Sequence, residues 1–280
     1  MLQLHDWMLL FSSTVRNIDT GGFIQSITRP LKMLVPVENL VIMMFRENAP
    51  PTVLHDALHE REHEMFYRQY MKGGYLFSPY YHAWRHDAGS GLYRMLEIMP
   101  EDFADTDAYR NYYLQNGLMD DMGYLIDLEE DAAILIGFGI YSREYTADEL
   151  TSLREIEPMI TACGYRHWHR MGKLMPDSSN LERQIHQKLE GAIDNFGDSI
   201  LSNREAEIAQ LLLRGHTTKS AAGKLNIAPG TVKNHRNNIY FKLDINSQSE
   251  LFSLFIQSVI HTQPGQAGDP LTGFFDRPAH

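Results

Sequence analysis

The chain has 280 residues, of which 43% are hydrophobic and 22% charged, and a formal net charge of −11 at pH 7. This globular composition excludes a chain disordered throughout, a collagen-like repeat and a disulfide scaffold, and the length suggests two domains or one large one. The single cysteine, Cys163, cannot form an internal disulfide, which indicates a reducing compartment. No apolar run reaches the ~18–20 residues that cross a bilayer, and Asp6 stands where a signal peptide carries positive charge. We therefore expect a cytoplasmic protein with no membrane partner.

The charge is unevenly distributed along the chain. Residues 199–260 contain seven Lys and Arg against four Asp and Glu, a net charge of +3, which leaves −14 for the rest. The overall negative charge argues against a protein that coats nucleic acid by bulk attraction. A small basic module on a large acidic body indicates instead that only this module lies against phosphates.

The N-terminal region mixes helical and strand patterns, as an α+β domain does. Helices are predicted over 1–18, 23–34, 60–72 and 102–114, and strands over 39–45, 52–58, 91–98, 122–128 and 132–140. The last two strands form a hairpin around a polar turn. A further helix follows Thr146, which caps it together with Glu149. We predict a sensor or dimerisation domain over 1–175, with an antiparallel sheet flanked by helices.

Two connecting segments complete the predicted organisation. Pro176 breaks the preceding helix, and a new helix with apolar residues at helical spacing ends at Gly197, so residues 176–198 are predicted to be a linker and connecting helix. Residues 261–280 are rich in Pro and Gly, which predicts a mobile tail.

The strongest pattern lies between residues 199 and 260, where four short helices are predicted. Ser202 is a suitable N-cap with Glu205 three residues later, and Thr217 caps a second short helix. A third helix runs over 231–243 and a fourth over 247–260. Apolar residues of the third helix recur at helical spacing and leave polar and basic residues on the other side. This is the arrangement by which a helix enters the DNA major groove.

This segment resembles the helix-turn-helix domain of the LuxR family of transcription regulators. The matching residues are Leu201, Ser202, Arg204, Glu205, Gly215, Lys219, Ala222, Leu225, Ile227, Thr231, Val232, Lys233, Asn234, His235, Ile239, Lys242, Leu243, Ser247 and Glu250. The resemblance implies an all-α four-helix domain that binds double-stranded DNA. It implies that Lys233, Asn234 and Asn237 read bases, and that phosphates are contacted by Lys219, Thr231, His235 and Arg236. Lysine donating to guanine and asparagine pairing with adenine agree with the first set.

Some residues depart from the family pattern. Gly223 lies inside a helix, at a cost of about 1 kcal/mol relative to Ala. Ala228 replaces the usual Ser cap of the third helix, Ala221 replaces a larger aliphatic, and Gln248 stands where Arg is common. The fourth helix offers more apolar surface than one small module needs, through Leu251, Phe252, Leu254, Phe255 and Val259. In the family this helix pairs two copies, so we expect a homodimer.

An aromatic-rich segment between Tyr67 and Trp84 is similar to the sensor region of LuxR-type regulators and, more diffusely, to GAF-like sensor domains. Ser78 stands where acyl-homoserine-lactone receptors place an Asp, which weakens a quorum-signal interpretation. Aromatic walls with a few polar groups suit a ligand pocket. The predicted ligand-binding residues are Tyr67, Tyr70, Phe77, Ser78, Tyr80 and Trp84. We predict a GAF/PAS-like domain that senses a small molecule, with a purely dimerising domain as the alternative.

A third hypothesis is a zinc-dependent hydrolase. His59, Glu60 and His63 match the H-E-x-x-H pattern, in which two imidazoles one helical turn apart bind zinc beside a glutamate base. The neighbouring charged residues indicate a solvated helix, and no downstream ligand completes the longer signature. The sequence therefore predicts a sequence-specific DNA-binding transcription regulator that is not an enzyme, with no catalytic residues, no metal and no cofactor.

Overall fold

The computed structural model describes residues 4–47, 49–99, 118–129, 131–172, 180–261, 268–272 and 274. The N-terminal part contains five strands: β1 (Asn39–Arg46), β2 (Ala49–Ala57), β3 (Gly91–Arg94), β4 (Asp120–Asp127) and β5 (Ala132–Ile140). They form one antiparallel sheet in the order β2-β1-β5-β4-β3. The predicted antiparallel sheet and the hairpin of its last two strands, β4 and β5, are thereby confirmed.

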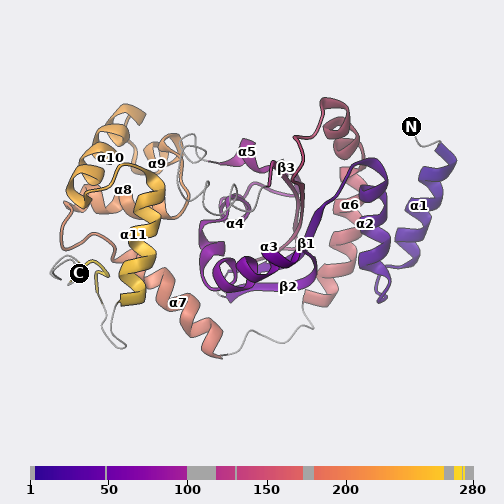
Figure 1. The fold of residues 1–280 in the computed structure, drawn as a ribbon, viewed down its shortest axis with the longest axis horizontal. Coiled ribbons are helices and arrows are strands. Elements are labelled where there is room, and N and C mark those ends of the chain that lie inside the picture. Colours follow the sequence, from indigo (N-terminus) through magenta and orange to yellow (C-terminus); the bar gives the residue numbers. More distant parts are fainter. Residues whose placement is uncertain are drawn as a thin grey trace.

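Both faces of the sheet are covered by helices. Successive side chains of a strand point to opposite faces, so each strand contributes to the packing on both. On one face lie α1 (Leu4–Arg16), α2 (Phe23–Leu34) and α6 (Ala147–Gly172), with α2 and α6 against the sheet and α1 outside them (Figure 1). On the other lie α3 (Glu60–Met65), a π-helical turn at Phe66–Tyr70, a 3-10 turn at Gly74–Phe77 and α4 (Pro79–Arg85). Burial on both faces explains why β5 reads as an almost unbroken apolar run.

The alternation separates two apolar cores. Ile42 and Met44 of β1 contribute to the core beneath α2 and α6, whereas Met43 and Phe45 contribute to the core beneath α4. The capping pair predicted for α6 is also present, since the Thr146 amide donates to Glu149 at 2.8 Å and the Glu149 amide donates to the Thr146 hydroxyl at 3.3 Å.

Three local predictions need correction or lie outside the described residues. The strand predicted over 91–98 ends at Arg94 and is followed by the short helix α5 (Met95–Ile98). The helix predicted over 60–72 is divided between α3 and the π-helical turn, because aromatic packing on the sheet overrides helical propensity there. The helix predicted over 102–114 lies outside the described residues.

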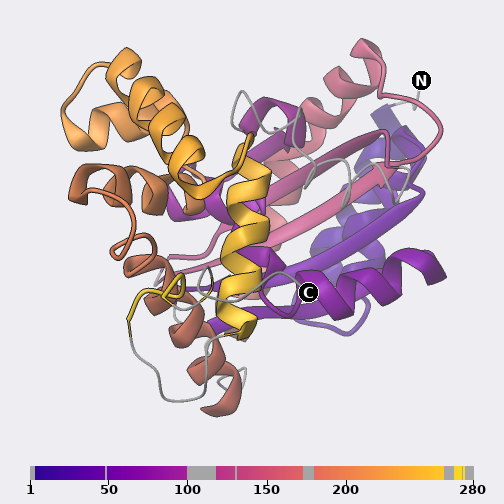
Figure 2. The ribbon, with the colours of Figure 1, turned by 60° about the vertical axis from the view of Figure 1, so that its left-hand side comes forward.

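The C-terminal part is helical, as predicted. After α7 (Asn180–Asp194) come α8 (Asn203–Leu213), α9 (Thr218–Leu225), α10 (Pro229–Leu243) and α11 (Gln248–His261). Figure 2 shows α11 (yellow) in front of the sheet, with the other helices of the module (orange) to its left. Ser202 and Glu205 form the predicted capping box, and the Thr217 hydroxyl accepts from the Ser220 amide at 3.1 Å.

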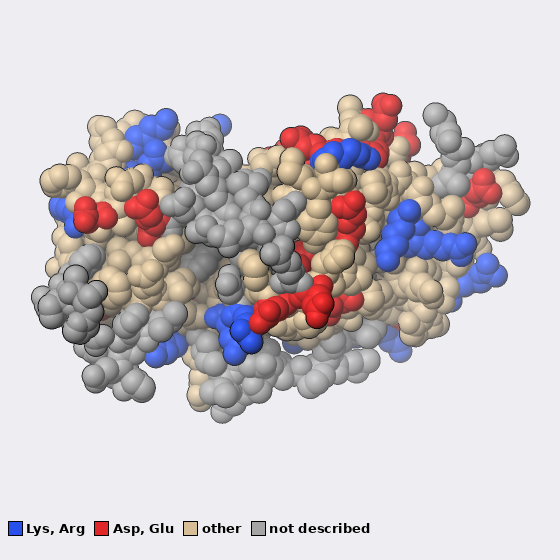
Figure 3. Space-filling model, in the orientation of Figure 1, with Lys and Arg blue, Asp and Glu red and all other residues tan. Residues whose placement is uncertain are grey.

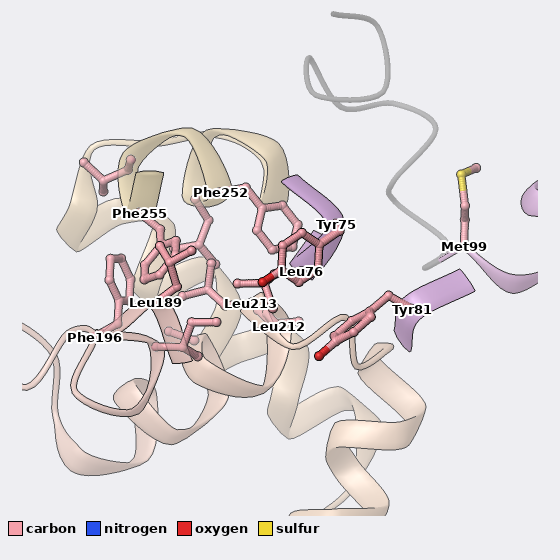
Figure 4. Close-up of a cluster of buried hydrophobic side chains, with 14 of the residues drawn as sticks. Tyr75, Leu76, Tyr81, Met99, Leu189, Phe196, Leu212, Leu213, Phe252 and Phe255 are labelled. Carbon is pink, nitrogen blue, oxygen red and sulfur yellow. The ribbon is translucent and has the colours of Figure 1, made fainter. Parts of the chain in front are cut away.

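The two parts share one apolar cluster. Tyr75 and Leu76 of the 3-10 turn lie beside Leu212 of α8 and Phe252 of α11 (Figure 4). Polar contacts accompany this packing. The Tyr75 hydroxyl is 2.7 Å from Nδ1 of His186 on α7, and the other ring nitrogen of His186 is 3.2 Å from the Glu47 carbonyl oxygen. The C-terminal helical module is therefore docked on the N-terminal domain.

The prediction of a mobile tail is wrong for residues 268–272. Asp269 accepts hydrogen bonds from the amides of Gly197 and Ser199, at 3.0 and 2.7 Å, and Leu271 is fully buried. The composition of the tail concealed this contact, because one aspartate and one leucine are enough to anchor a segment rich in glycine and proline.

Candidate DNA-reading face and sensor cavity

The orientation of α10 is set by contacts between the first and third helices of the module. Val232, Ile239 and Leu243 are buried beneath α8 and α9. Lys242 donates to the Glu205 carboxylate at 2.6 Å, so the residue that caps α8 also holds the end of α10. Burial acts to raise the pKa of Glu205, but the Lys242 ion pair and the Ser202 amide outweigh it and lower this pKa to about 2. The capping box is thus part of the tertiary structure of the module.

The opposite side of α10 is exposed. Thr231, Lys233, Asn234 and Asn237 are all exposed, as is Lys219 at the start of α9. His235 and Arg236 are half-buried, and the Arg236 guanidinium lies 5.9 Å from the centre of the Tyr240 ring. In Figure 3 blue side chains lie at the upper edge of the end where Figure 1 places α10, with red ones below them, and both colours occur over the N-terminal domain. The proposed reading residues therefore face solvent within this chain.

The apolar side of α11 faces its own chain. Leu251, Phe252, Leu254 and Phe255 are buried against α7 and α8, and the Phe255 ring is 5.7 Å from that of Phe196. Gln248 at the start of the helix donates to the Leu212 carbonyl at 3.1 Å. The apolar surface on which the expected α11 dimer depended is thus occupied by intramolecular packing.

A cavity of about 70 Å³ lies between the sheet and the aromatic segment. Its lining combines apolar side chains with polar ones, and the residues are Asn39, Val41, Met43, Leu58, Glu62, Phe66, Tyr70, Ser78, Tyr80, Leu118, Asp121, Leu135, Gly137 and Phe138. Gly123 allows the Tyr80 ring to lie on the sheet, since a Cβ there would lie 2.7 Å from the ring. Such a mixture of apolar walls and a few polar groups is typical of small-molecule sites.

The structure brings together three of the six predicted ligand-binding residues. Tyr70, Ser78 and Tyr80 are buried and line the cavity. Tyr67 does not, because its hydroxyl donates to Asp56 at 2.9 Å on the edge strand β2. Trp84 does not either, since it stacks on Phe45 with ring centres 5.7 Å apart. The side chain of Phe77 lies outside the described residues.

Three polar residues of the lining were missed by sequence reasoning. Asn39 comes from β1, Glu62 from α3 and Asp121 from β4, and their proximity depends on the sheet topology. One signal was present: Asp120 and Asp121 are adjacent at the start of an apolar strand and therefore point to opposite faces. Asp120 is paired with Arg94, with distances of 2.9 and 2.8 Å, whereas Asp121 accepts from the Tyr80 hydroxyl at 3.2 Å.

The H-E-x-x-H segment lies at the start of α3. His59 is an exposed N-cap residue in extended conformation, and the exposed His63 lies 3.9 Å from an Asp56 carboxylate oxygen. Among the residues that the structure describes, no three His, Cys, Asp or Glu side chains are grouped so as to hold a metal ion. None of the helices in the described ranges has the length and apolar character of a membrane span.

These features define a helix-turn-helix DNA-binding domain docked on an α+β domain with an internal cavity. Residues 199–255 match the family described as "Bacterial regulatory proteins, luxR family". The C-terminal module is therefore a LuxR-type helix-turn-helix domain.

Comparisons with individual proteins agree with this assignment. A protein described as an HTH-type transcriptional regulator in the exeN 3' region of Aeromonas salmonicida is 27% identical over 200 residues, which is 69% of this chain and 100% of that protein. The uncharacterized response regulatory protein YgeK of Escherichia coli is 42% identical over 79 residues, 28% of this chain and 54% of that protein. The VqsR LBD domain of Pseudomonas aeruginosa has a similar fold, with a TM-score of 0.50, 22% identity and coverage of 59% and 97% of the two chains.

Proposed function

We propose that the N-terminal domain senses a small molecule and that its occupancy changes the position of the DNA-binding module. The observation that carries this proposal is the double role of residues 70–86. Tyr70, Ser78 and Tyr80 of this segment line the cavity, while Tyr75 and Leu76 pack on the module. A ligand that shifts the segment therefore acts on both sites, which is the structural requirement for coupling. The similarity in fold to the VqsR LBD domain supports a sensor role.

We further propose that two copies bind a two-fold DNA site, with α10 of each in successive major grooves. Half-sites of helix-turn-helix dimers lie about 34 Å apart, so a ligand that alters the placement of the module alters whether both helices reach DNA. Gel-shift titrations of the full chain with and without a cavity ligand test this coupling. Equal DNA affinity in both conditions contradicts it.

The Lys233→Ala variant is expected to lose specific binding. If Lys233 donates to guanine, binding to the sequence selected from random DNA falls by about 1–3 kcal/mol more than binding to random DNA. Lys219→Ala is the matched control, because a phosphate contact weakens both equally and reduces the salt slope by about 1. Fluorescence anisotropy at several salt concentrations measures both effects. Equal losses for Lys233→Ala on the two DNAs would reassign Lys233 to a phosphate contact.

A second copy of the chain is proposed to pair through α1 instead of α11. Met8, Phe11 and Val15 fall on one side of α1 and are 58%, 43% and 43% exposed, while Leu10 on the other side is buried against neighbouring helices. In Figure 1, α1 and α10 lie at opposite ends of the molecule, so pairing through α1 leaves each reading helix uncovered but far from its partner's. The two reading helices then reach successive grooves only when the modules leave their docked positions. Phe11→Glu is expected to give a monomer by light scattering.

The control for this dimer prediction is Gln25→Glu, which adds the same charge on an exposed position of α2 and is expected to leave the dimer intact. A dimer that survives Phe11→Glu combined with Val15→Glu would show that another surface pairs the two copies.

A further inference from the structure

We propose that the sensor cavity selects a ligand with a positively charged nitrogen, such as a primary ammonium on a short apolar chain. This inference rests on the proposed sensor function and specifies its ligand class. It starts from the lining, whose described residues include two carboxyl groups, those of Glu62 and Asp121, and no Lys, Arg or His. Near Asp121, the Arg94 guanidinium donates hydrogen bonds to the carboxylates of Asp120 and Glu144, at 2.8 and 2.6 Å.

The hydrogen bonds around Glu62 and Asp121 also favour a cationic ligand. The Asn39 amide donates to Glu62 at 2.9 Å, the Tyr141 hydroxyl also donates to Glu62, and the Tyr80 hydroxyl donates to Asp121. These donors are directed at the two carboxylates. What remains is an acceptor: Oδ1 of Asn39 is buried without a hydrogen-bond partner, in a residue that is 8% exposed.

Such a site is complementary to a donor. A buried acceptor without a partner is costly, and a carboxylate withdrawn from water is stabilised by a cation. A primary ammonium supplies three N–H donors and a positive charge but no acceptor. Neutral acyl compounds supply mainly carbonyl oxygens. In this cavity those oxygens would meet other acceptors, with which they cannot form hydrogen bonds. The apolar walls, including Val41, Met43 and Leu135, suit the chain that carries the nitrogen.

Protonation gives this inference an independent readout. Burial, with Glu62 and Asp120 nearby, raises the pKa of Asp121 to about 8, so this carboxyl is mostly protonated at pH 7. An ammonium that binds beside it favours the ionised form. Binding at pH 7 is therefore expected to release close to one proton, and affinity is expected to increase as the pH rises toward 8.

The test compares three probes with four carbon atoms each on the full chain: butylammonium, 1-butanol and butyrate. Isothermal titration calorimetry at pH 7 in buffers of different ionisation enthalpy measures affinity and proton release together. We expect butylammonium to bind at least tenfold more tightly than either analogue and to release a proton. Asp121→Asn should abolish the release and the preference, and Glu62→Gln should reduce the preference. Asp127→Asn, an exposed position on the same strand, is the control and should change neither.

The outcomes separate this inference from the proposed function. Equal binding of butylammonium and 1-butanol, or no binding of butylammonium at tens of millimolar, overturns the ligand class. If a neutral acyl lactone then binds and alters DNA affinity, the sensor function stands with a different ligand. If butylammonium binds as expected but DNA affinity is unchanged, the ligand class stands and the sensor function fails.

Discussion

Gly215→Ala is expected to force the DNA-binding module off the N-terminal domain. Gly215 follows α8 with a φ of +75°, and a Cβ there would lie 2.2 Å from the His82 ring of α4. The left-handed conformation costs a residue with a side chain about 1–2 kcal/mol, and overpacking adds about 1–3 kcal/mol. From these two terms we expect the docked arrangement to lose about 2–5 kcal/mol. Faster hydrogen exchange in residues 75–86 and a larger radius of gyration by X-ray scattering would report it.

Gly223→Ala is the control for this substitution. Gly223 lies inside α9, where an added Cβ would meet no atom within 4 Å, so alanine there is expected to stabilise the helix by up to about 1 kcal/mol. The His82→Ala variant removes the ring and so separates the steric contribution of the Gly215 substitution from the contribution of its backbone conformation. In the double variant the loss should be smaller than the sum of the single losses. Strictly additive effects would show that His82 does not limit the approach of residue 215.

Acidification is expected to loosen the same contact. His82 of α4 and His86, which follows the end of that helix, meet His216 of the helical module. We call these three residues the histidine cluster; the His86 and His216 rings are 4.0 Å apart. Nε2 of His82 and Nε2 of His216 are buried without a hydrogen-bond partner. Burial, followed by the charges of neighbouring histidines, lowers the pKa of His82 and of His216 to about 3.

The groups around the histidine cluster make protonation unfavourable. Arg85 faces His82, and Lys224 and Arg214 face His216, so each proton enters a cationic environment. Asp87 beside His86 opposes this, as does the Glu47 carboxylate 2.8 Å from Arg85. Histidines released to water have a pKa near 6.5. The docked arrangement is therefore unaffected above about pH 6.5 and loses about 1.4 kcal/mol per pH unit for each histidine below it.

X-ray scattering of the full chain at pH 7.5 and pH 5.5 measures this effect. We expect expansion at the lower pH, which should be reduced in the combined variant His82→Gln and His216→Gln because neither side chain then gains a proton. His59→Gln, an exposed histidine of another element, should leave the transition unchanged. A transition that is the same in the double variant would assign the pH dependence to other groups.

The helix-turn-helix module was the part most open to prediction, because its signals are local. The capping box joins residues three positions apart, and the buried side chains of α10 follow one helical period. The Gly223 and Ala228 departures are tolerated: Gly223 is exposed, and Ala228 caps α10 without a side-chain hydrogen bond. The surplus of apolar residues on α11 predicted a dimer surface, but most of them are covered by α7 and α8 of the same chain. A sequence does not show which part of its own chain covers a helix.

The sequence by itself determined the fold class, the hairpin of β4 and β5, and the helix α10, since each follows from hydrophobic periodicity and caps between near neighbours. The tertiary structure alone decided the acceptor-rich cavity, because Asn39, Glu62 and Asp121 belong to elements far apart in sequence that meet only when β1 and β4 take their places in the sheet. It also decided the docking contact, where Gly215 and His216 of the C-terminal module lie against His82. Burial and long-range electrostatics depend on such neighbours, and no local pattern encodes them.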